Sequence, residues 1–315
     1  ELSALPGLSS GADVGASSFV AGNGTLLAPV GIIDRPYYQR LDELIIDFHQ
    51  HGGHMALCGG PQSGKSSALR TIVSALALRH SPKAARFYVI DLGGGQLASL
   101  ERLPHVAGVA GRDEGEKVRR IVDEVAGFIR RPEQCATFLV IDGWHHIGTS
   151  NAEFEDIAEK VTEIVADGAS AHVHVIIATS RWTTMRPAIR DLIANRLELR
   201  LGESLDSLID RKLQQKLPSA PGRGLTLAGE NMLLARTSNQ DIAHICRVHA
   251  AADPVPQLKM LPAVLTPSAL ATQGNVPDGE IAWGIGGRDL DPLTWNPSRE
   301  PHLVAIGAQG CGKST

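Results

Sequence analysis

Residues 59–66 read Gly-Gly-Pro-Gln-Ser-Gly-Lys-Ser and match the pattern G-x-x-x-x-G-K-[ST]. The apolar run Met55–Cys58 precedes them, and from Ser66 to about His80 apolar residues recur at the i, i+3, i+4, i+7 spacing of one helix face. In such a segment, glycines let successive backbone N–H groups point at a phosphate, and the helix start adds partial positive charge. The segment therefore predicts a phosphate-binding loop, against the alternative of a chance glycine turn.

The residue types in this loop indicate what it binds. Lys65 is expected to reach the β- and γ-phosphates of ATP, and the Ser66 hydroxyl is expected to ligate Mg²⁺. We therefore predict ATP and Mg²⁺ as the cofactors. The predicted binding residues of the loop are Gly59, Gly60, Pro61, Gln62, Ser63, Gly64, Lys65, Ser66 and Ser67.

Short apolar runs alternate with helical patterns along the next hundred residues. The runs Arg86–Asp91, Thr137–Ile141 and Val173–Ala178 have the length of buried strands. Together with Met55–Cys58 they make four strands separated by helices. This alternation predicts an α/β fold with a mostly parallel sheet and helices on both faces.

Three elements are predicted beyond residue 195. Arg196–Leu201 alternates charged and apolar residues, as a half-exposed strand does. Ser204 is expected to cap a helix that runs on through Leu213. Leu225–Ala235 is typical of a closing hairpin around Gly229.

Hydrolysis of a nucleoside triphosphate also needs an acidic residue that holds Mg²⁺ and, usually next to it, a carboxylate that activates water. Asp142 follows the run Phe138–Ile141 and is the predicted second metal ligand, with a strand-end turn residue as the alternative. Gly143 stands where a glutamate is expected, and no carboxylate lies between Asp142 and Glu153. Loss of a positioned general base costs ~10²- to 10⁴-fold in rate, so we assign no catalytic residue and expect slow chemistry unless another group substitutes.

Thr179 and Arg223 are two further candidate contacts to the nucleotide. Thr179 follows the run Val173–Ala178, where it is placed to sense the γ-phosphate; a helix cap is the alternative. Arg223 lies in the turn Pro221–Gly224 and is a candidate to touch nucleotide or a neighbouring domain, unless it is a solvated turn arginine.

Asp91 and several histidines lie near these motifs. Asp91 is predicted to cap the loop Gly93–Gly95, with a supporting position behind the metal ligands as the alternative. The segment His49–His54 has the spacing H-x-H-x-x-H, but it lacks acidic or cysteine support, which favours ordinary polar histidines over a metal site. His145 and His146 follow close after the predicted metal ligand and have no assigned role.

The phosphate-loop pattern returns at residues 307–314, Gly-Ala-Gln-Gly-Cys-Gly-Lys-Ser, after a strand-like run His302–Ile306. A repeat at domain-sized spacing indicates two copies of one fold. The second copy would bind phosphate through Gly307, Gly312, Lys313, Ser314 and Thr315.

The repeat and the proline distribution predict four parts. We expect a lead-in at 1–30, one ATPase domain at 31–250, a Pro-rich linker at 251–280 and the truncated start of a second ATPase domain at 281–315. The chain is accordingly expected to be a fragment of a longer tandem protein.

Composition narrows the class of protein. Lys and Arg number 30 against 34 Asp and Glu, a net charge of −4, which gives no global attraction to nucleic acid. No apolar run reaches the length of a membrane span, and the four cysteines have no metal-ligand spacing. A soluble cytosolic segment that does not bind nucleic acid is expected.

Several motifs together resemble those of one family. They are Gly31–Pro36, Gly59–Ser66, Phe87–Gly95 with Leu103–Val106, Ile141–Trp144, Leu197–Gly202 and Pro221–Gly224. Over 31–240, and again at 281–315, the chain resembles the FtsK/SpoIIIE branch of RecA-like motor ATPases. Within that branch it is similar to the second ATPase domain, and the start of the third, of the EccC-type ATPases of mycobacterial type VII (ESX) secretion. The stretch Arg130–Phe138 is shorter than that family usually has.

The resemblance implies a RecA-like P-loop fold in a string of ATPase domains at the cytoplasmic face of the inner membrane. It implies as partners the other EccC domains and subunits of a hexamer, ESX membrane-complex components, and secreted Esx, PE and PPE substrates. Later domains of such motors bind ATP but are often catalytically degenerate, which agrees with Gly143. The predicted function is an ATP-binding, weakly or non-hydrolysing domain of a motor that drives protein export.

Two alternatives from other classes stay open at this point. An FtsK-like DNA translocase is disfavoured by the net charge and by the lack of a basic stretch interleaved with aromatic residues. A structural adaptor with a vestigial loop is disfavoured by the intact trio Gly64, Lys65 and Ser66, which no structural need explains.

Overall fold

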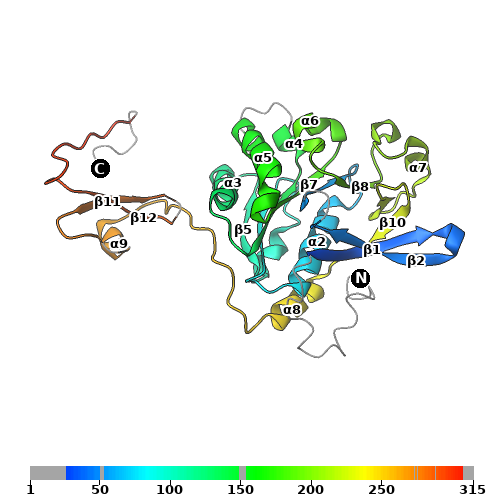
Figure 1. Ribbon diagram of the computed structural model, residues 1–315, viewed down its shortest axis with the longest axis horizontal. Helices are drawn as coiled ribbons and strands as arrows, with labels where there is room; N and C mark the ends of the chain where they lie inside the picture. Colours follow the sequence, from blue (N-terminus) through cyan, green and yellow to red (C-terminus); the bar gives the residue numbers. More distant parts are fainter. Residues whose placement is uncertain are drawn as a thin grey trace. The chain divides into compact units, whose positions relative to one another are not determined.

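The computed structural model describes residues 26–49, 53–148, 154–272, 274, 276–287 and 289–307. These residues belong to two compact units, one up to Leu258 and one from Lys259. The first unit is built on a ten-stranded sheet with the order β2-β1-β10-β9-β8-β3-β7-β6-β4-β5 (Figure 1).

Six neighbouring strands of this sheet run parallel. In spatial order they are β8 (Asn195–Leu199), β3 (Met55–Cys58), β7 (Val173–Thr179), β6 (Ala136–Asp142), β4 (Ala85–Asp91) and β5 (Val106–Gly111). Every residue of β3, β4, β6 and β7 is buried, because helices cover both faces of the sheet. Burial on both faces explains why these strands read as unbroken apolar runs in the sequence.

Helices from different parts of the chain cover the two faces. On one face, α2 (Lys65–Arg79) packs with α8 (Asn239–Val248) in one apolar cluster that includes Leu69 and Ile242. On the other face, α3 (Gly115–Arg130) and α5 (Glu155–Asp167) form a separate cluster with the strands. The predicted α/β fold, with a mostly parallel sheet between layers of helices, is confirmed.

An antiparallel extension continues the sheet beyond β8. It consists of β9 (Arg223–Leu225), β10 (Asn231–Leu234), β1 (Leu27–Arg35) and β2 (Arg40–Asp47). The strands β9 and β10 form the predicted hairpin, in which Gly229 adopts a positive φ of 79°. Figure 1 shows the β1–β2 hairpin projecting from the sheet.

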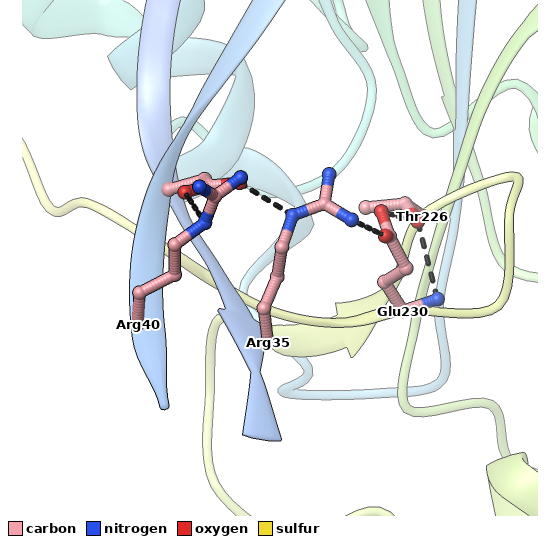
Figure 2. Close-up of polar contacts among 5 residues, drawn as sticks. Arg35, Arg40, Thr226 and Glu230 are labelled. Carbon is pink, nitrogen blue, oxygen red and sulfur yellow. Dashed lines mark hydrogen bonds and ion pairs between the residues drawn. The ribbon is translucent and has the colours of Figure 1, made fainter. Parts of the chain in front are cut away.

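Arg35 ties the end of the β1–β2 hairpin to the turn between β9 and β10 (Figure 2). Its Nε donates to Asp42 at 2.5 Å, and its Nη1 pairs with Glu230. Glu230 in turn donates its backbone N–H to the Thr226 hydroxyl at 3.2 Å. The guanidinium therefore bridges two hairpins that are nearly 200 residues apart in the chain.

The segment after β8 differs from the predicted helix capped by Ser204. Residues Ser204–Asp206 form only a single 3₁₀ turn, and α7 (Arg211–Lys216) begins after Asp210. The Asp210 carboxylate caps α7 by accepting hydrogen bonds from the N–H groups of Lys212 and Leu213. Two other short helices of the first unit are α4 (His145–Gly148) and α6 (Pro187–Arg190).

The Pro-rich segment begins as part of the first unit. The N–H of Val255 donates to the carbonyl of Pro104 at 2.9 Å, and that of Leu258 donates to Ala107 at 2.8 Å. The Val255 side chain is buried in the apolar cluster on the α3 face. This part of the chain therefore runs along the start of the edge strand β5.

The second unit contains α9 (Pro267–Thr272) and a two-stranded antiparallel sheet, β11 (Ile281–Gly286) and β12 (Asp291–Trp295). Its hairpin shares two backbone features with β1–β2. The register shifts directly before Gly31 in one and before Gly284 in the other, and Gln39 and Leu290, at φ 51° and 55°, immediately precede the second strand.

The predicted strand His302–Ile306 is wrong, because residues 301–307 have no regular structure. A strand needs a hydrogen-bonding neighbour, and in the described part of this unit β11 and β12 pair only with each other. Across the described residues of the whole chain, no helix has the length and apolar character to cross a membrane.

Candidate nucleotide-binding site

The glycine-rich loop joins β3 to α2 at the carboxyl end of the parallel strands. Its turn needs two residues in the left-handed region, Gln62 at φ 56° and Gly64 at φ 100°. A side chain at Gly64 would also crowd the backbone, since its Cβ would lie 3.0 Å from the amide nitrogen of Gly222. Ser63 closes the turn by donating its hydroxyl to the carbonyl of Gly60 at 2.8 Å.

Backbone hydrogen bonds hold the loop to three neighbouring segments. Gly59 donates its N–H to the carbonyl of Thr179 at 3.1 Å, and Gly60 donates to Arg200 at 2.8 Å. The Ser63 carbonyl accepts from the N–H of Gly222 at 2.9 Å, and the Gly222 carbonyl accepts from Leu234 of β10 at 2.9 Å. The ends of β7 and β8 and the turn before β9 therefore fix the loop.

The start of α2 presents the donors that a phosphate needs. The first hydrogen bond of the helix runs from the N–H of Ala68 to the carbonyl of Gly64 at 2.8 Å. The backbone N–H groups of Gly64, Lys65, Ser66 and Ser67 thus have no acceptor within the helix. Such N–H groups, together with the positive end of the helix dipole, fit an anionic phosphate.

Lys65 extends along the loop. Its Nζ donates to the carbonyl oxygens of Gly59 and Gly60, at 2.8 Å each. Burial lowers the pKa of Lys65, while the nearby Asp142 carboxylate acts in the opposite direction. The ammonium group is therefore held above the loop by acceptors that phosphate oxygens can replace.

The two predicted Mg²⁺ ligands lie against each other. The Ser66 hydroxyl donates to Oδ2 of Asp142 at 2.5 Å, although Asp142 ends β6 and Ser66 begins α2. Asp142 is 1% exposed, and burial raises the pKa of its carboxyl. Gly93 makes room for this carboxylate, since a Cβ at that position would lie 2.7 Å from Oδ2.

This pair of oxygen ligands fits Mg²⁺. The ion usually takes one or two protein oxygens and completes its shell with water and phosphate oxygens. A cage of three or more His, Cys, Asp or Glu side chains does not occur among the described residues. When bound, Mg²⁺ would neutralise phosphate charge, and Ser66 and Asp142 would position it.

Gly143 has a conformation that the sequence does not reveal. Its φ is +79°, a left-handed value that glycine adopts without strain. An added Cβ would lie 3.1 Å from the amide nitrogen of Gly93 and 3.3 Å from Cδ2 of His146. The position expected to carry a catalytic glutamate is thus a tight turn that disfavours any side chain.

Thr179 lies at the end of β7, between β3 and β6, so the fold brings it to the phosphate loop. Its side chain is buried, and its hydroxyl lies 2.7 Å from that of Thr184. The part of Thr179 that touches the loop is its carbonyl oxygen, which accepts the Gly59 N–H. The neighbouring Arg181 pairs with Glu203 at 3.2 Å.

Arg223 begins β9, one residue after the Gly222 amide that binds the loop. Its backbone carbonyl accepts from the N–H of Arg200 at 3.2 Å. Within the described residues, its guanidinium forms no ion pair or hydrogen bond. Arg223 thus lies beside the loop, and its guanidinium has no ion-pair partner among the described residues.

Asp91 caps its glycine loop, as predicted. Its carboxylate accepts the N–H of Gly93 at 3.1 Å and that of Leu97 at 2.7 Å.

In the histidine segment His49–His54, His54 is buried, and its Nδ1 accepts the N–H of Val175 at 3.0 Å. Burial lowers the pKa of His54 to about 4, so it serves as a neutral core residue. His51 lies outside the described residues.

Glu198, next to the phosphate loop, is buried, although the sequence pattern predicted a half-exposed strand there. The alternation in Arg196–Leu201 predicts a half-exposed strand, yet the Glu198 side chain is completely buried. Glu198 lies beside Cys58 in the strand next to the loop. Its carboxylate accepts hydrogen bonds from four donors, the Trp182 indole, the Ser207 hydroxyl, the Leu208 N–H and the Gln214 amide, at 2.7, 2.7, 2.8 and 3.0 Å.

The second phosphate-loop motif lies at the end of the described chain. Gly307 has no regular secondary structure. The other residues predicted to bind phosphate there, Gly312, Lys313, Ser314 and Thr315, lie outside the described residues.

The fold and the site are those of a P-loop nucleotide-binding protein. The FtsK/SpoIIIE family model matches residues 22–244, and the chain belongs to this family. Membership of this P-loop ATPase family implies nucleotide binding.

Relatives of this chain include proteins of ESX secretion systems. In an alignment 332 positions long, the chain is 35% identical to the ESX secretion system protein EccC of Thermomonospora curvata. The alignment covers 92% of this chain and 25% of that protein. It is 36% identical to EccC4 of the ESX-4 system of Mycobacterium tuberculosis, again over 92% of this chain and 25% of the relative. With EccCb1 of the ESX-1 system of M. tuberculosis it shares 31% identity over 91% of this chain and 56% of the relative. The chain therefore spans from a quarter to about half of these relatives.

Solved structures give the same result. ATPases 2 and 3 of Thermomonospora curvata EccC, in complex with a signal sequence peptide, match with a TM-score of 0.77 and 33% identity over 93% of this chain and 60% of that one. ATPases 2 and 3 of EssC from Geobacillus thermodenitrificans match with a TM-score of 0.72 at 18% identity, over 88% of this chain and 60% of that one, which shows the common fold. The predicted resemblance to EccC-type ATPases is confirmed.

Proposed function

We propose that this chain is an ATP-binding module of an EccC-type motor that exports proteins through a type VII (ESX) secretion system. The observation that carries the nucleotide site is the contact of 2.5 Å between Ser66 and Asp142, next to a helix start with uncommitted N–H groups. Lys65 and the backbone of residues 59–67 hold the phosphates of ATP, and Ser66 and Asp142 hold Mg²⁺. Thr179 and Arg223 border the same loop.

The arrangement supports nucleotide binding more strongly than fast hydrolysis. Gly143 offers no carboxylate, and its left-handed φ of 79° keeps one from being added without strain. Bound ATP then acts mainly by setting the conformation of the module and its contacts with neighbouring domains.

The relatives of this chain support a proposal for the setting of the module. We infer a motor at the cytoplasmic face of the inner membrane, in which this module contacts other EccC domains, subunits of a hexamer and ESX membrane components. The cargo is the Esx, PE and PPE class of substrates. A second module that begins near residue 281 is supported by the bulge and left-handed turn that β11–β12 shares with β1–β2.

The DNA-translocase alternative has less support. The net charge of the chain is −4, and three relatives that match about nine-tenths of it are ESX secretion proteins.

Equilibrium binding of labelled ATP with Mg²⁺ tests the proposal. The parent is expected to bind ATP, and Lys65→Ala is expected to lose that binding because the loop then lacks its ammonium group. Lys212→Ala, which removes an exposed lysine on α7, is the matched control and should bind as the parent does. Equal affinity of the parent and Lys65→Ala would refute the site.

A further inference from the structure

Gln62 holds a backbone conformation that is costly for a residue with a side chain. Its φ is 56°, in the left-handed region that glycine adopts freely and other residues adopt rarely. The phosphate-loop motif returns at residues 307–314, and the position that corresponds to Gln62 there is Gly310. The motif itself therefore does not require a glutamine. A residue held in a costly conformation at a binding site points to a function for its side chain.

The Gln62 amide forms no hydrogen bond with any residue that the structure describes, and the side chain is exposed. The neighbouring side chains of the loop differ in this respect. Pro61 has no polar group, and the Ser63 hydroxyl donates to the carbonyl of Gly60 at 2.8 Å. Among residues 59–64, all of which are described, Gln62 is therefore the one whose side chain can offer a hydrogen-bond donor to a ligand.

The terminal phosphate of a nucleotide is expected close to Gln62. The start of the loop is fixed from beneath, because Gly59 and Gly60 donate their N–H groups to carbonyls at the ends of β7 and β8. The Lys65 ammonium group lies at the same place, 2.8 Å from the carbonyl oxygens of Gly59 and Gly60. The lysine of a phosphate loop reaches the β- and γ-phosphates, which puts the γ-phosphate over the part of the loop that ends at Gln62.

We propose that Gln62 recognises the γ-phosphate and makes this site prefer ATP to ADP. The proposal rests on the ATP site proposed above. The side-chain NH₂ group donates a hydrogen bond to an oxygen of the γ-phosphate, which ADP lacks. Such a bond is strong because its acceptor is charged. No proton is transferred and no covalent bond breaks, so this role is compatible with glycine at position 143.

Equilibrium binding of ADP and of a non-hydrolysable ATP analogue, each with Mg²⁺, tests the proposal. Gln62→Gly allows the same loop conformation and removes the amide, and we expect it to weaken binding of the ATP analogue about 10-fold or more. Its affinity for ADP should change by less than about 2-fold, because ADP has no γ-phosphate. An unchanged preference for the ATP analogue over ADP in this variant would refute the proposal.

Gln39→Gly is the matched control. Gln39 is also an exposed glutamine with a left-handed φ, of 51°, but it lies in the turn of the β1–β2 hairpin (Figure 1). Both substitutions place glycine where it is free of strain, so neither should lower the melting temperature of the protein. Gln39→Gly should bind both nucleotides as the parent does. Loss of ATP affinity in Gln62→Gly at an equal or higher melting temperature then reports the missing amide and not a damaged fold.

Gln62→Glu separates a direct contact from a change in the loop. Glutamate has the same length and shape as glutamine, but its carboxylate would place a negative charge beside the γ-phosphate. Binding of the ATP analogue should weaken at least as much as in Gln62→Gly, and ADP binding should weaken less. Added salt should reduce the loss, since it screens repulsion between exposed charges. A glutamate that leaves the affinity for the ATP analogue unchanged would overturn the contact.

The outcomes distinguish this inference from the proposed function. If Lys65→Ala abolishes nucleotide binding and Gln62→Gly keeps the parent's preference for ATP, the site stands and Gln62 does not recognise the γ-phosphate. If Gln39→Gly shifts the preference as Gln62→Gly does, the effect is not local to the loop and the inference is also overturned. If the parent binds neither nucleotide, the proposed function itself fails.

Discussion

The Ser66 hydroxyl lies 2.5 Å from Oδ2 of Asp142, although 76 residues separate them. The contact exists because β7 lies between β3 and β6, which brings the first turn of α2 to the end of β6. Two residues that the sequence offers as candidate ligands are thereby brought together, and their oxygens would suit a cation.

Replacement of Asp142 by asparagine should separate stability from cation binding. Burial raises the pKa of this carboxyl in the folded protein, so its ionisation at neutral pH costs stability. Without nucleotide, Asp142→Asn should melt at a higher temperature than the parent at pH 7.5. The difference should shrink as the pH falls through the folded pKa towards the ordinary value of 3.8. Mg²⁺ and ATP should raise the melting temperature of the parent but not of the variant, and an equal rise in both would contradict the role of Asp142.

Gly143→Glu should fail to create a faster ATPase. A side chain at φ +79° and 3.1 Å from the Gly93 amide nitrogen should cost about 1–3 kcal/mol of unfolding free energy. Gly143→Ala should show the same direction in urea titrations. Gly127→Ala is the control, because it lies in α3 with open space around it and should gain about 0.5–1 kcal/mol. A stable and fast Gly143→Glu variant would show that the turn can relax.

Acid should destabilise the fold through its buried histidines. Burial lowers the pKa of His54, His105 and His174 to about 4, whereas an unfolded chain titrates near 6.5. A folded state that resists protonation is stable above the unfolded pKa and loses that stability as the pH falls towards the folded value. The unfolding free energy should therefore drop between pH 6.5 and 4.

His174→Phe tests how much of this acid destabilisation comes from one histidine. The ring of His174 stacks on Phe138 with centroids 4.9 Å apart, so phenylalanine keeps the aromatic packing and removes the titration. Urea unfolding at pH 7.5 and 4.5 should show a smaller loss in the variant than in the parent. Equal losses would assign the acid sensitivity to other groups.

Glu198→Gln should destabilise the first unit without touching the phosphate loop. The buried carboxylate accepts four hydrogen bonds through its two oxygens. A glutamine amide has only one acceptor oxygen, and its NH₂ group would face donors that the second carboxylate oxygen now accepts. The expected cost is about 2–4 kcal/mol in a urea titration. Glu203→Gln, an exposed partner of Arg181, should cost less than about 1 kcal/mol. Similar effects of the two changes would contradict the role given to the Glu198 network.

The central strands could be predicted because burial on both faces leaves an unbroken apolar run, as in β4 and β6. The edge strand β5, Val-Ala-Gly-Val-Ala-Gly, could not, because its small residues give no strand signal. It is stabilised by a distant segment, residues 255–258, which supplies hydrogen bonds at its start. Local patterns do not record such a partner.

The site shows the same division. The spacing of the loop motif predicted that Lys65 and Ser66 begin a helix after a glycine turn, because backbone geometry and residue type are both local there. The predicted helix cap at Ser204 was wrong. The buried carboxylate of Glu198, in β8, accepts hydrogen bonds from the Ser207 hydroxyl and the Leu208 N–H, which keeps these two residues out of a helix. The turn at Gly143 depends on the approach of Gly93, which only the folded sheet provides.

The Gly222 peptide connects the phosphate loop to the antiparallel part of the sheet. Its N–H is bonded to Ser63 in the phosphate loop, and its carbonyl is bonded to Leu234 of β10. One rigid peptide plane thus links the phosphate loop to the antiparallel strands. At the other end of β10, Arg35 of β1 forms an ion pair with Glu230. The phosphate loop is therefore connected to the β1–β2 hairpin through the Gly222 peptide and strand β10, with no helix in between.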